Sequence, residues 1–296
     1  MSLAMRKRLC GQTAVRLQTN SGIKMASAKA QPMKRFVLQN GVFYVVVLVI
    51  AFGLKYHYSK AGSDELTWIL APTAGLVEQF SGIRFENETP IGFVNHEYRV
   101  IIAPSCAGVN FLIIAFCMAG FYGIHRLGRW QHKMEWLAAG AFSAYLLTLV
   151  VNTLRIILAI FMYHADIYRG WITPQRMHRL EGIVIYFFFL CLFYMIIKMV
   201  MHTIARAASG KQKENSAENY PGSVYFQWIC AGLIPMFWYV LITLGVPLIN
   251  GAYRSNAVRF AEHGIVVICG CLIVVAALFL IQFGWQRFKN RVKRCT

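Results

Sequence analysis

The sequence predicts an all-α fold, a polytopic membrane helical bundle with about six transmembrane helices. Of its 296 residues, 57% are hydrophobic and only 14% are charged, whereas soluble domains carry roughly 25% charged residues. Six stretches also reach the length of about 20 apolar residues that crosses a bilayer as a helix. They lie near residues 36–54, 106–124, 136–162, 183–203, 224–249 and 264–284.

A further apolar stretch, residues 66–83, precedes the second of these segments. It contains Pro72, Gly75, Glu78 and Gly82. A carboxylate is costly in the bilayer core, and proline interrupts the hydrogen bonds of a helix. We therefore expect an interfacial or re-entrant element on the outer side of the membrane.

The positive charges indicate how the segments are oriented. The two ends of the chain and alternate connections carry 20 of the 30 Lys and Arg residues but only three acidic residues. The connections on the opposite side carry nine basic and nine acidic residues. Loops rich in Lys and Arg stay in the cytoplasm, so both termini are expected there. The net charge of +18 is thus interpreted as membrane topology, and no nucleic-acid partner is expected.

Polar and basic segments divide the chain into four expected parts. Residues 1–35 form a basic cytoplasmic arm, and residues 36–204 hold the first four membrane segments. Residues 205–222 are polar, with Ser, Gly, Asn and Pro, which is typical of a linker. Residues 223–296 hold the last two membrane segments and a basic tail.

Cys106 stands out among the eight cysteines because it lies at a segment boundary, between Pro104 and Gly108. We expect it in the first turn of the second membrane helix, where exposed backbone N–H groups favour a thiolate. Gly108 would permit close approach of another backbone, and Asn110, at i+4 from Cys106, could orient a substrate amide. The alternative is that Cys106 is a small packing residue at a helix end.

Arg155 is a charged residue inside the third membrane segment. With that segment ending near Tyr163, the arginine lies roughly 12 Å below its outer end. A buried arginine costs about 3 kcal/mol or more, which favours a functional role, and Asn152 shares its face of the helix. The alternative is a structural ion pair, but no acid occurs inside the six segments as we place them.

His178 lies just before the fourth membrane segment. Its imidazole titrates near neutral pH, and Gly182, at i+4, would allow tight helix packing on the same face. Glu181 could pair with it or solvate the interface. An exposed interfacial histidine is the alternative, and His164 is a competing candidate. The remaining histidines lack metal-ligand spacing, so no metal site is expected.

Several sequence elements together resemble the exosortase/archaeosortase family. They are the run Ile101–Phe111, Asn152-x-x-Arg155, His178-x-x-x-Gly182 and the element Trp68–Ala74, and the resemblance covers about 36–203. In this family the catalytic positions are a cysteine, an arginine and a third residue, which His178 matches here. A histidine at the third position favours the bacterial branch. The four-segment core that carries the resemblance is short, which indicates the exosortase K subgroup.

The resemblance implies a membrane cysteine transpeptidase. Its protein substrates would carry a C-terminal sorting signal, consisting of a short motif, a transmembrane helix and a basic tail. The enzyme would cleave this signal at the outer face of the bacterial cytoplasmic membrane and transfer the acyl group from a cysteine thioester to an acceptor. Cys106 would be the nucleophile, Arg155 would stabilise the oxyanion or the thiolate, and His178 would be the general acid and base. Asn110, Asn152, Gly108 and Gly182 would support them, and no cofactor is expected.

Other classes of protein remain open at this point. A membrane transporter of an anionic solute would use Arg155 without Cys106. A membrane acyltransferase would use the same thiol on a lipid, and an assembly protein would need none of the three residues.

Overall fold

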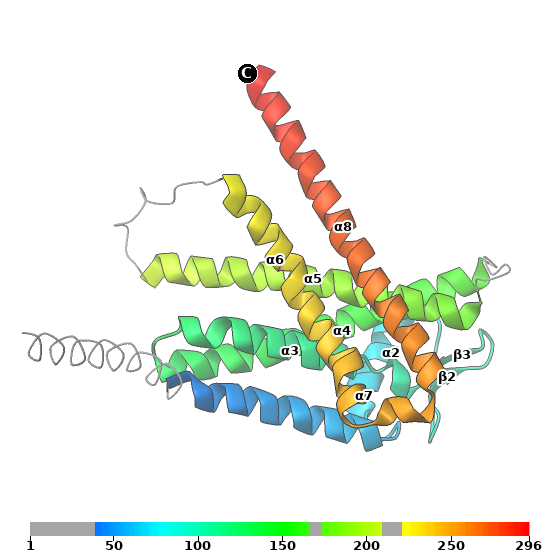
Figure 1. The fold of residues 1–296 in the computed structure, drawn as a ribbon. Coiled ribbons are helices and arrows are strands. Elements are labelled where there is room, and N and C mark those ends of the chain that lie inside the picture. Colours follow the sequence, from blue (N-terminus) through cyan, green and yellow to red (C-terminus); the bar gives the residue numbers. More distant parts are fainter. Residues whose placement is uncertain (1–38, 166–172, 209–220, 296) are drawn as a thin grey trace, which may run out of the picture. The chain divides into compact units, whose positions relative to one another are not determined.

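The computed structural model describes residues 39–165, 173–208 and 221–295 (Figure 1). The expected arm 1–35 and residues 209–220 of the expected linker lie outside this part. The chain divides into two compact units, Met1–Val46 and Val47–Thr296. In the first unit the structure describes the start of the helix Gln39–Lys60. Every other helix and strand described below belongs to the second unit.

Six helices of the described residues are long and apolar enough to cross a membrane. The prediction of an all-α polytopic bundle is therefore confirmed, and each expected segment overlaps one of these helices. The candidate spans are Gln39–Lys60, Pro104–Arg126, Trp130–His164, Arg176–Ala207, Ala231–Ile249 and Ala257–Trp285.

Helix α3 (Val109–Gly123) forms the centre of the second unit, where it packs against three other helices. These are α4 (Trp130–His164), α5 (Pro174–Ala208) and α6 (Pro221–Val240). Nearly every residue of α3 is buried, as expected for a helix that is apolar on all sides. At its far end Gly123 makes room for Trp136, whose indole Nε1 donates a hydrogen bond of 2.9 Å to the carbonyl of Ala119.

Residues 66–83 form the helix α2 (Thr67–Ser81), which packs against α4. Its 15 residues extend over roughly 22 Å, which is short of the hydrocarbon thickness of about 30 Å. The hydroxyl of Tyr145 on α4 donates a hydrogen bond of 2.8 Å to the carbonyl of Trp68, and the two rings stack. The interfacial placement of this element stays a prediction.

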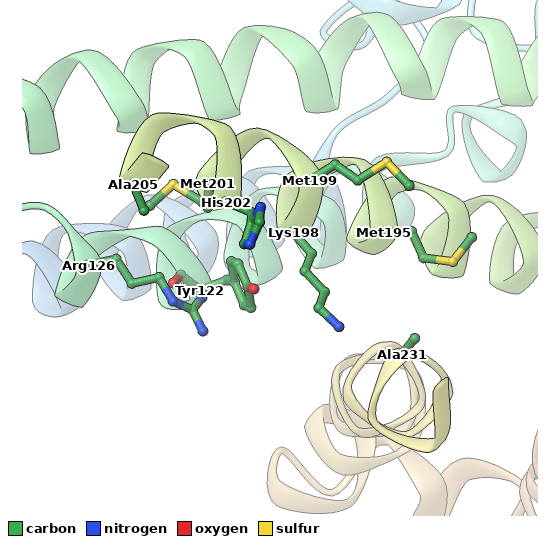
Figure 2. A pocket seen from close by; sticks show the side chains of 9 residues that line it. All are labelled: Tyr122, Arg126, Met195, Lys198, Met199, Met201, His202, Ala205 and Ala231. Carbon is green, nitrogen blue, oxygen red and sulfur yellow. Dashed lines mark hydrogen bonds between the residues drawn. The ribbon is translucent and has the colours of Figure 1, made fainter. Parts of the chain in front are cut away.

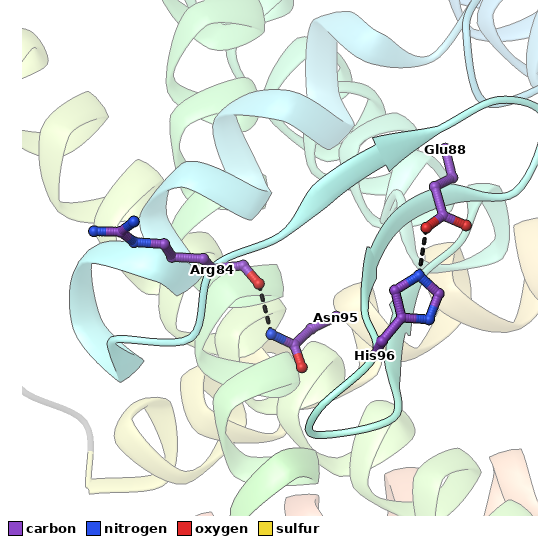
Figure 3. A network of polar contacts seen from close by, with 4 residues as sticks. All are labelled: Arg84, Glu88, Asn95 and His96. Atoms are coloured by element: carbon purple, nitrogen blue, oxygen red, sulfur yellow. Dashed lines mark hydrogen bonds and ion pairs between the residues drawn. The ribbon is translucent and has the colours of Figure 1, made fainter.

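A three-stranded antiparallel sheet lies between α2 and α3 in the sequence. Its strands β1 (Glu86–Glu88), β2 (Gly92–Asn95) and β3 (Val100–Ile102) follow the order β1-β2-β3. The amide of Asn95 donates a hydrogen bond of 2.7 Å to the carbonyl of Arg84, and the His96 ring meets Glu88 across the β1–β2 hairpin (Figure 3). Of the three strands, β3 (Val-Ile-Ile) has the β-branched composition that is typical of a strand. The other two strands lack the alternation of apolar residues that marks a half-buried strand.

The fifth membrane segment is not one uninterrupted α-helix. A π-helical turn, Leu241–Gly245, separates α6 from α7 (Val246–Ile249). Pro247 explains this interruption, because proline cannot donate the helical hydrogen bond to the preceding turn. The last helix, α8 (Ala257–Cys295), packs against α5 and α6.

Candidate active site

Cys106 lies at a sharp corner between β3 and α3. Pro104–Cys106 form a single 3-10 turn, and Gly108 then adopts the left-handed conformation with φ of 71° before α3 begins at Val109. The expectation that Cys106 occupies the first turn of the α-helix is therefore wrong. Gly108 causes the difference, because its positive φ ends the 3-10 turn and redirects the chain.

Gly108 also allows side chains of two other helices to approach the corner. A Cβ atom at this position would lie 3.1 Å from the Thr148 methyl group on α4 and 3.4 Å from the Tyr186 hydroxyl on α5. The close approach expected from the sequence is thus present, but it involves side chains rather than another backbone.

The guanidinium of Arg155, on α4, brings the three predicted catalytic side chains together. Arg155 is only 6% exposed. Its Nη2 lies 3.8 Å from Cys106 Sγ and 3.0 Å from His178 Nε2. Both contacts involve the same nitrogen atom, Nη2. Cys106 Sγ and His178 Nε2 are therefore close neighbours on either side of the guanidinium. A thiol, a fixed positive charge and an imidazole therefore share one site.

The contact with Arg155 defines the hydrogen-bonding state of His178. A guanidinium can only donate hydrogen bonds, so Nε2 of His178 accepts one and the ring proton lies on Nδ1. His178 is thus neutral in this arrangement. It forms no direct hydrogen bond with Cys106, because the guanidinium lies between the two side chains.

Tyr186, on α5, completes a network that the sequence analysis did not identify. Its hydroxyl accepts a hydrogen bond from Arg155 Nη1 and donates one of 2.8 Å to Asn152 Oδ1. The Asn152 amide in turn donates to the backbone carbonyl of Cys106. The network thereby connects the guanidinium to the backbone that carries the thiol. The spacing of eight residues from His178 places Tyr186 on the same face of α5, and this was the signal available in the sequence.

Asn110 has a partner within the protein that the sequence did not predict, and its role toward a substrate amide stays a prediction. Its Oδ1 accepts a hydrogen bond of 2.6 Å from Lys55 Nζ, on the helix Gln39–Lys60. Tyr58, one turn further along that helix, lies within electrostatic reach of Cys106 and Arg155. The first membrane helix therefore contributes polar groups to the surroundings of the thiol.

Glu181 is an acid inside a candidate membrane span, which the sequence analysis did not expect. The span begins at Arg176 and the helix at Pro174, whereas we placed the segment from residue 183. Glu181 is 8% exposed, and its Oε1 has no hydrogen-bond partner among the described residues. It interacts electrostatically with Arg155 without forming a salt bridge. Arg155 is therefore not held in a simple structural ion pair, which was the alternative interpretation.

A cavity of about 270 Å³ opens onto these groups. Cys106, His178 and Glu181 line it together with β3, the last two turns of α4 and the start of α5. Gly182 leaves space for the Arg155 side chain, since an added Cβ would make an ordinary contact of 3.7 Å with Arg155 Cδ. The arrangement can hold a peptide carbonyl against a nucleophile and a cation.

The competing histidine has another contact. His164 Nδ1 lies 2.8 Å from the carbonyl of Ile160, one turn earlier on α4. Within the described ranges, no group of three or more His, Cys, Asp or Glu side chains could hold a metal ion.

Comparison with known protein families identifies the family to which this chain belongs. The sequence profile described as transmembrane exosortase (Exosortase_EpsH) matches residues 32–195, more than half of the chain. The chain belongs to the transmembrane exosortase family. The match includes Cys106, Arg155 and His178, and membership supports the role of a membrane protease or transpeptidase. No curated protein and no solved structure matches the chain.

The match ends within α5, so α6, α7 and α8 of this exosortase lie outside it. The subgroup and the bacterial branch stay predictions.

Proposed function

We propose that this exosortase is a cysteine transpeptidase that cleaves C-terminal sorting signals of exported proteins. The observation that carries the proposal is the position of Arg155, whose Nη2 contacts both Cys106 Sγ and His178 Nε2. Neither a transporter nor an assembly protein needs a thiol and an imidazole at the same guanidinium. Both termini would be cytoplasmic and the site would lie on the outer face of the bacterial cytoplasmic membrane, as the distribution of Lys and Arg predicts.

In the first step the sulfur of Cys106 attacks the peptide carbonyl of the sorting signal. A bond forms between Sγ and the carbonyl carbon, and the carbonyl oxygen becomes negatively charged. The Arg155 guanidinium, already 3.8 Å from Sγ, stabilises this oxyanion. Arg155 is only 6% exposed, and a charge shielded from water acts more strongly than in solution.

His178 carries the proton in the proposed mechanism. Its neutral Nε2 accepts the thiol proton once the guanidinium turns to the oxyanion, and it then gives this proton to the leaving amine as the C–N bond breaks. The product is a thioester on Cys106. An acceptor nucleophile then attacks the thioester and gives its proton to His178. The C–S bond breaks, the acyl group leaves on the acceptor, and His178 returns the proton to the Cys106 sulfur. Glu181, with an unpaired oxygen in the same cavity, is placed to hold the amine.

The test is a substitution of the nucleophile in the full-length protein. The substrate is a co-expressed reporter that carries a C-terminal sorting signal encoded in the same genome. Cys106→Ala should abolish processing of the reporter while the enzyme still inserts in the membrane. Cys269→Ala, which removes an exposed cysteine of α8, should leave processing unchanged. Normal maturation of the reporter with Cys106→Ala would overturn the proposal.

Mass spectrometry of Cys106 identifies the acyl group. A peptidyl thioester trapped on Cys106 supports transpeptidation. A fatty acyl group in its place would assign the protein to the lipid acyltransferases and overturn the peptide substrate.

A further inference from the structure

The strand β3 has one open edge. It pairs with β2 and is the last strand of the sheet. Val100 and Ile101 both line the cavity that contains Cys106, although consecutive side chains of a strand point to opposite faces. A cavity that borders both residues indicates a position along an edge of the strand, and β2 occupies the other edge. The open edge of β3 thus faces the candidate active site.

This edge leads directly to the nucleophile. Only Ala103 separates β3 from the turn Pro104–Cys106. Ile101 is 51% exposed, so the strand can be reached from outside the protein. The rest of the cavity lining comes largely from α4 and α5, with apolar residues such as Ile156, Ile160 and Met177. An extended peptide in this cavity would have backbone groups of β3 on one side and apolar side chains on the other.

We infer that the sorting motif binds as an additional strand along β3. The backbone of the peptide pairs with the open edge, a mode of recognition in which main-chain hydrogen bonds provide affinity and pockets for alternate side chains provide specificity. Its scissile carbonyl then lies at Cys106. This inference rests on the proposed function, since it specifies how the same site holds its protein substrate.

Disulfide cross-linking between one cysteine introduced into the enzyme and one introduced into the reporter tests the strand. The enzyme carries Ile101→Cys together with Cys106→Ala, which retains the uncleaved reporter. Cysteines are placed one at a time along the reporter before its cleavage site. Since opposite side chains on one face of a sheet repeat every second residue, disulfide yield should alternate with a period of two. Ile91→Cys, exposed in the β1–β2 turn, is the matched control and should give no alternation.

The two proposals can fail separately. Uniform or absent cross-linking at Ile101→Cys, with a peptidyl thioester still formed on Cys106 in the native enzyme, would overturn the strand and leave the transpeptidase intact. Absence of any thioester with every reporter would count against the proposed function itself.

A second and independent feature is a cavity of about 570 Å³ at the end of the helices opposite Cys106 (Figure 2). Residues at the end of α3 and in the second half of α5 line it together with Ala231 of α6. On α5 the lining residues follow helical spacing, which places them on one face. They include Met195, Lys198, Met199, His202 and Ala205.

The lining combines positive charge with flexible apolar side chains. Arg126 and Lys198 are cations, and none of the described lining residues is acidic. The Arg126 guanidinium lies over the ring of Tyr122 and donates a hydrogen bond of 2.9 Å to the carbonyl of the same residue. The methionines supply a surface that adapts to irregular apolar ligands. A ligand with an anionic head and hydrocarbon chains fits this combination.

The geometry points to a binding site for an anionic phospholipid in the membrane leaflet at this end of the helices. Basic pockets between transmembrane helices bind such headgroups, and the three helices α3, α5 and α6 form such a pocket. The headgroup phosphate would contact Arg126 and Lys198, and the acyl chains would lie against Met195 and Met199.

Binding of fluorescent phosphatidylglycerol to the purified full-length protein in detergent tests this site. Lys198→Gln and Arg126→Gln should each weaken binding about fivefold, the effect of one basic residue at a membrane surface. Lys198→Arg, which keeps the charge, should retain it. Arg206→Gln removes an exposed cation of α5 outside the cavity and should have no effect.

Three results would overturn the lipid site. The first is an equal loss with Arg206→Gln, which would indicate a diffuse surface charge. The second is binding of phosphatidylcholine as tightly as phosphatidylglycerol. The third is displacement of the lipid by inorganic phosphate at similar concentration, which would indicate a site for a free anion.

Discussion

At the scale of single residues, Arg155 is the side chain on which the geometry of the site depends. One guanidinium contacts a thiol, an imidazole and a phenol, which requires several donors in a fixed planar arrangement. Lysine keeps the charge but presents a compact ammonium on a flexible stem. Arg155→Lys should therefore lower the rate of reporter processing about 100-fold or more, the typical effect of losing an oxyanion donor. Processing at the native rate would show that charge alone suffices.

Tyr186 allows a test of the network that supports these contacts. Tyr186→Phe removes the partner of both Arg155 Nη1 and Asn152 Oδ1, and leaving buried polar groups unpaired costs about 1–3 kcal/mol. We expect a lower thermal midpoint and slower processing. Tyr194→Phe, on the same helix but in contact with Tyr122 instead, is the control. Equal effects of the two substitutions would contradict a special role for Tyr186.

The residues that the sequence identified share one property, which is chemistry that is unusual for their surroundings. A cation within an apolar segment and a cysteine at a boundary stand out without coordinates. Tyr186 did not, because the phenol is one of 14 tyrosines and aromatic residues are common in membrane helices. Glu181 was placed at the interface before the fourth segment, because α5 begins at Pro174, well ahead of the apolar run that marked the segment.

At the scale of elements, the corner between β3 and α3 determines where the thiol lies. Gly108 has a positive φ and a close contact with Thr148. Gly108→Ala should destabilise the protein by about 1–2 kcal/mol from the left-handed backbone alone, with a further loss from the contact. Gly82→Ala separates the two effects, since Gly82 has φ of 74° and nothing within 4 Å of an added Cβ. Thermal midpoints of the purified variants provide the comparison.

The converse experiment removes the contact between Thr148 and a side chain at position 108. Thr148→Ser removes the methyl group that an alanine at position 108 would meet. In combination with Gly108→Ala it should recover the stability lost beyond that of Gly82→Ala. No recovery would mean that the backbone conformation alone makes glycine necessary here.

The small sheet shows why the local sequence pattern was insufficient to predict every strand. β1 is Glu-Asn-Glu, a sequence that favours a loop when taken alone. It is a strand because it pairs with β2 in register from Glu86 with Val94 to Glu88 with Gly92. Pairing between segments is a property of the folded chain, and it cannot be predicted from a short stretch of sequence.

At the scale of the whole molecule, the helices beyond the family match contact α5, the helix that carries His178. Gly270 of α8 faces Ile183 of α5, and an added Cβ would lie 2.9 Å from the Ile183 Cγ2 methyl group. Ile183 directly follows Glu181 and Gly182, which line or border the site. The last long helix therefore restricts the position of the segment that carries His178 and Glu181.

This contact predicts that α8 affects catalysis without touching substrate. Gly270→Val should force α8 away from α5, because overpacking a close contact costs about 1–3 kcal/mol, and both the thermal midpoint and reporter processing should fall. Gly264→Ala, where an added Cβ meets Leu244 at an ordinary 3.8 Å, is the matched control on the same helix. Adding Ile183→Ala should restore processing in the Gly270→Val background, since it removes the methyl group that clashes. If processing stays normal in Gly270→Val while the midpoint falls, α8 stabilises the protein but does not position the site.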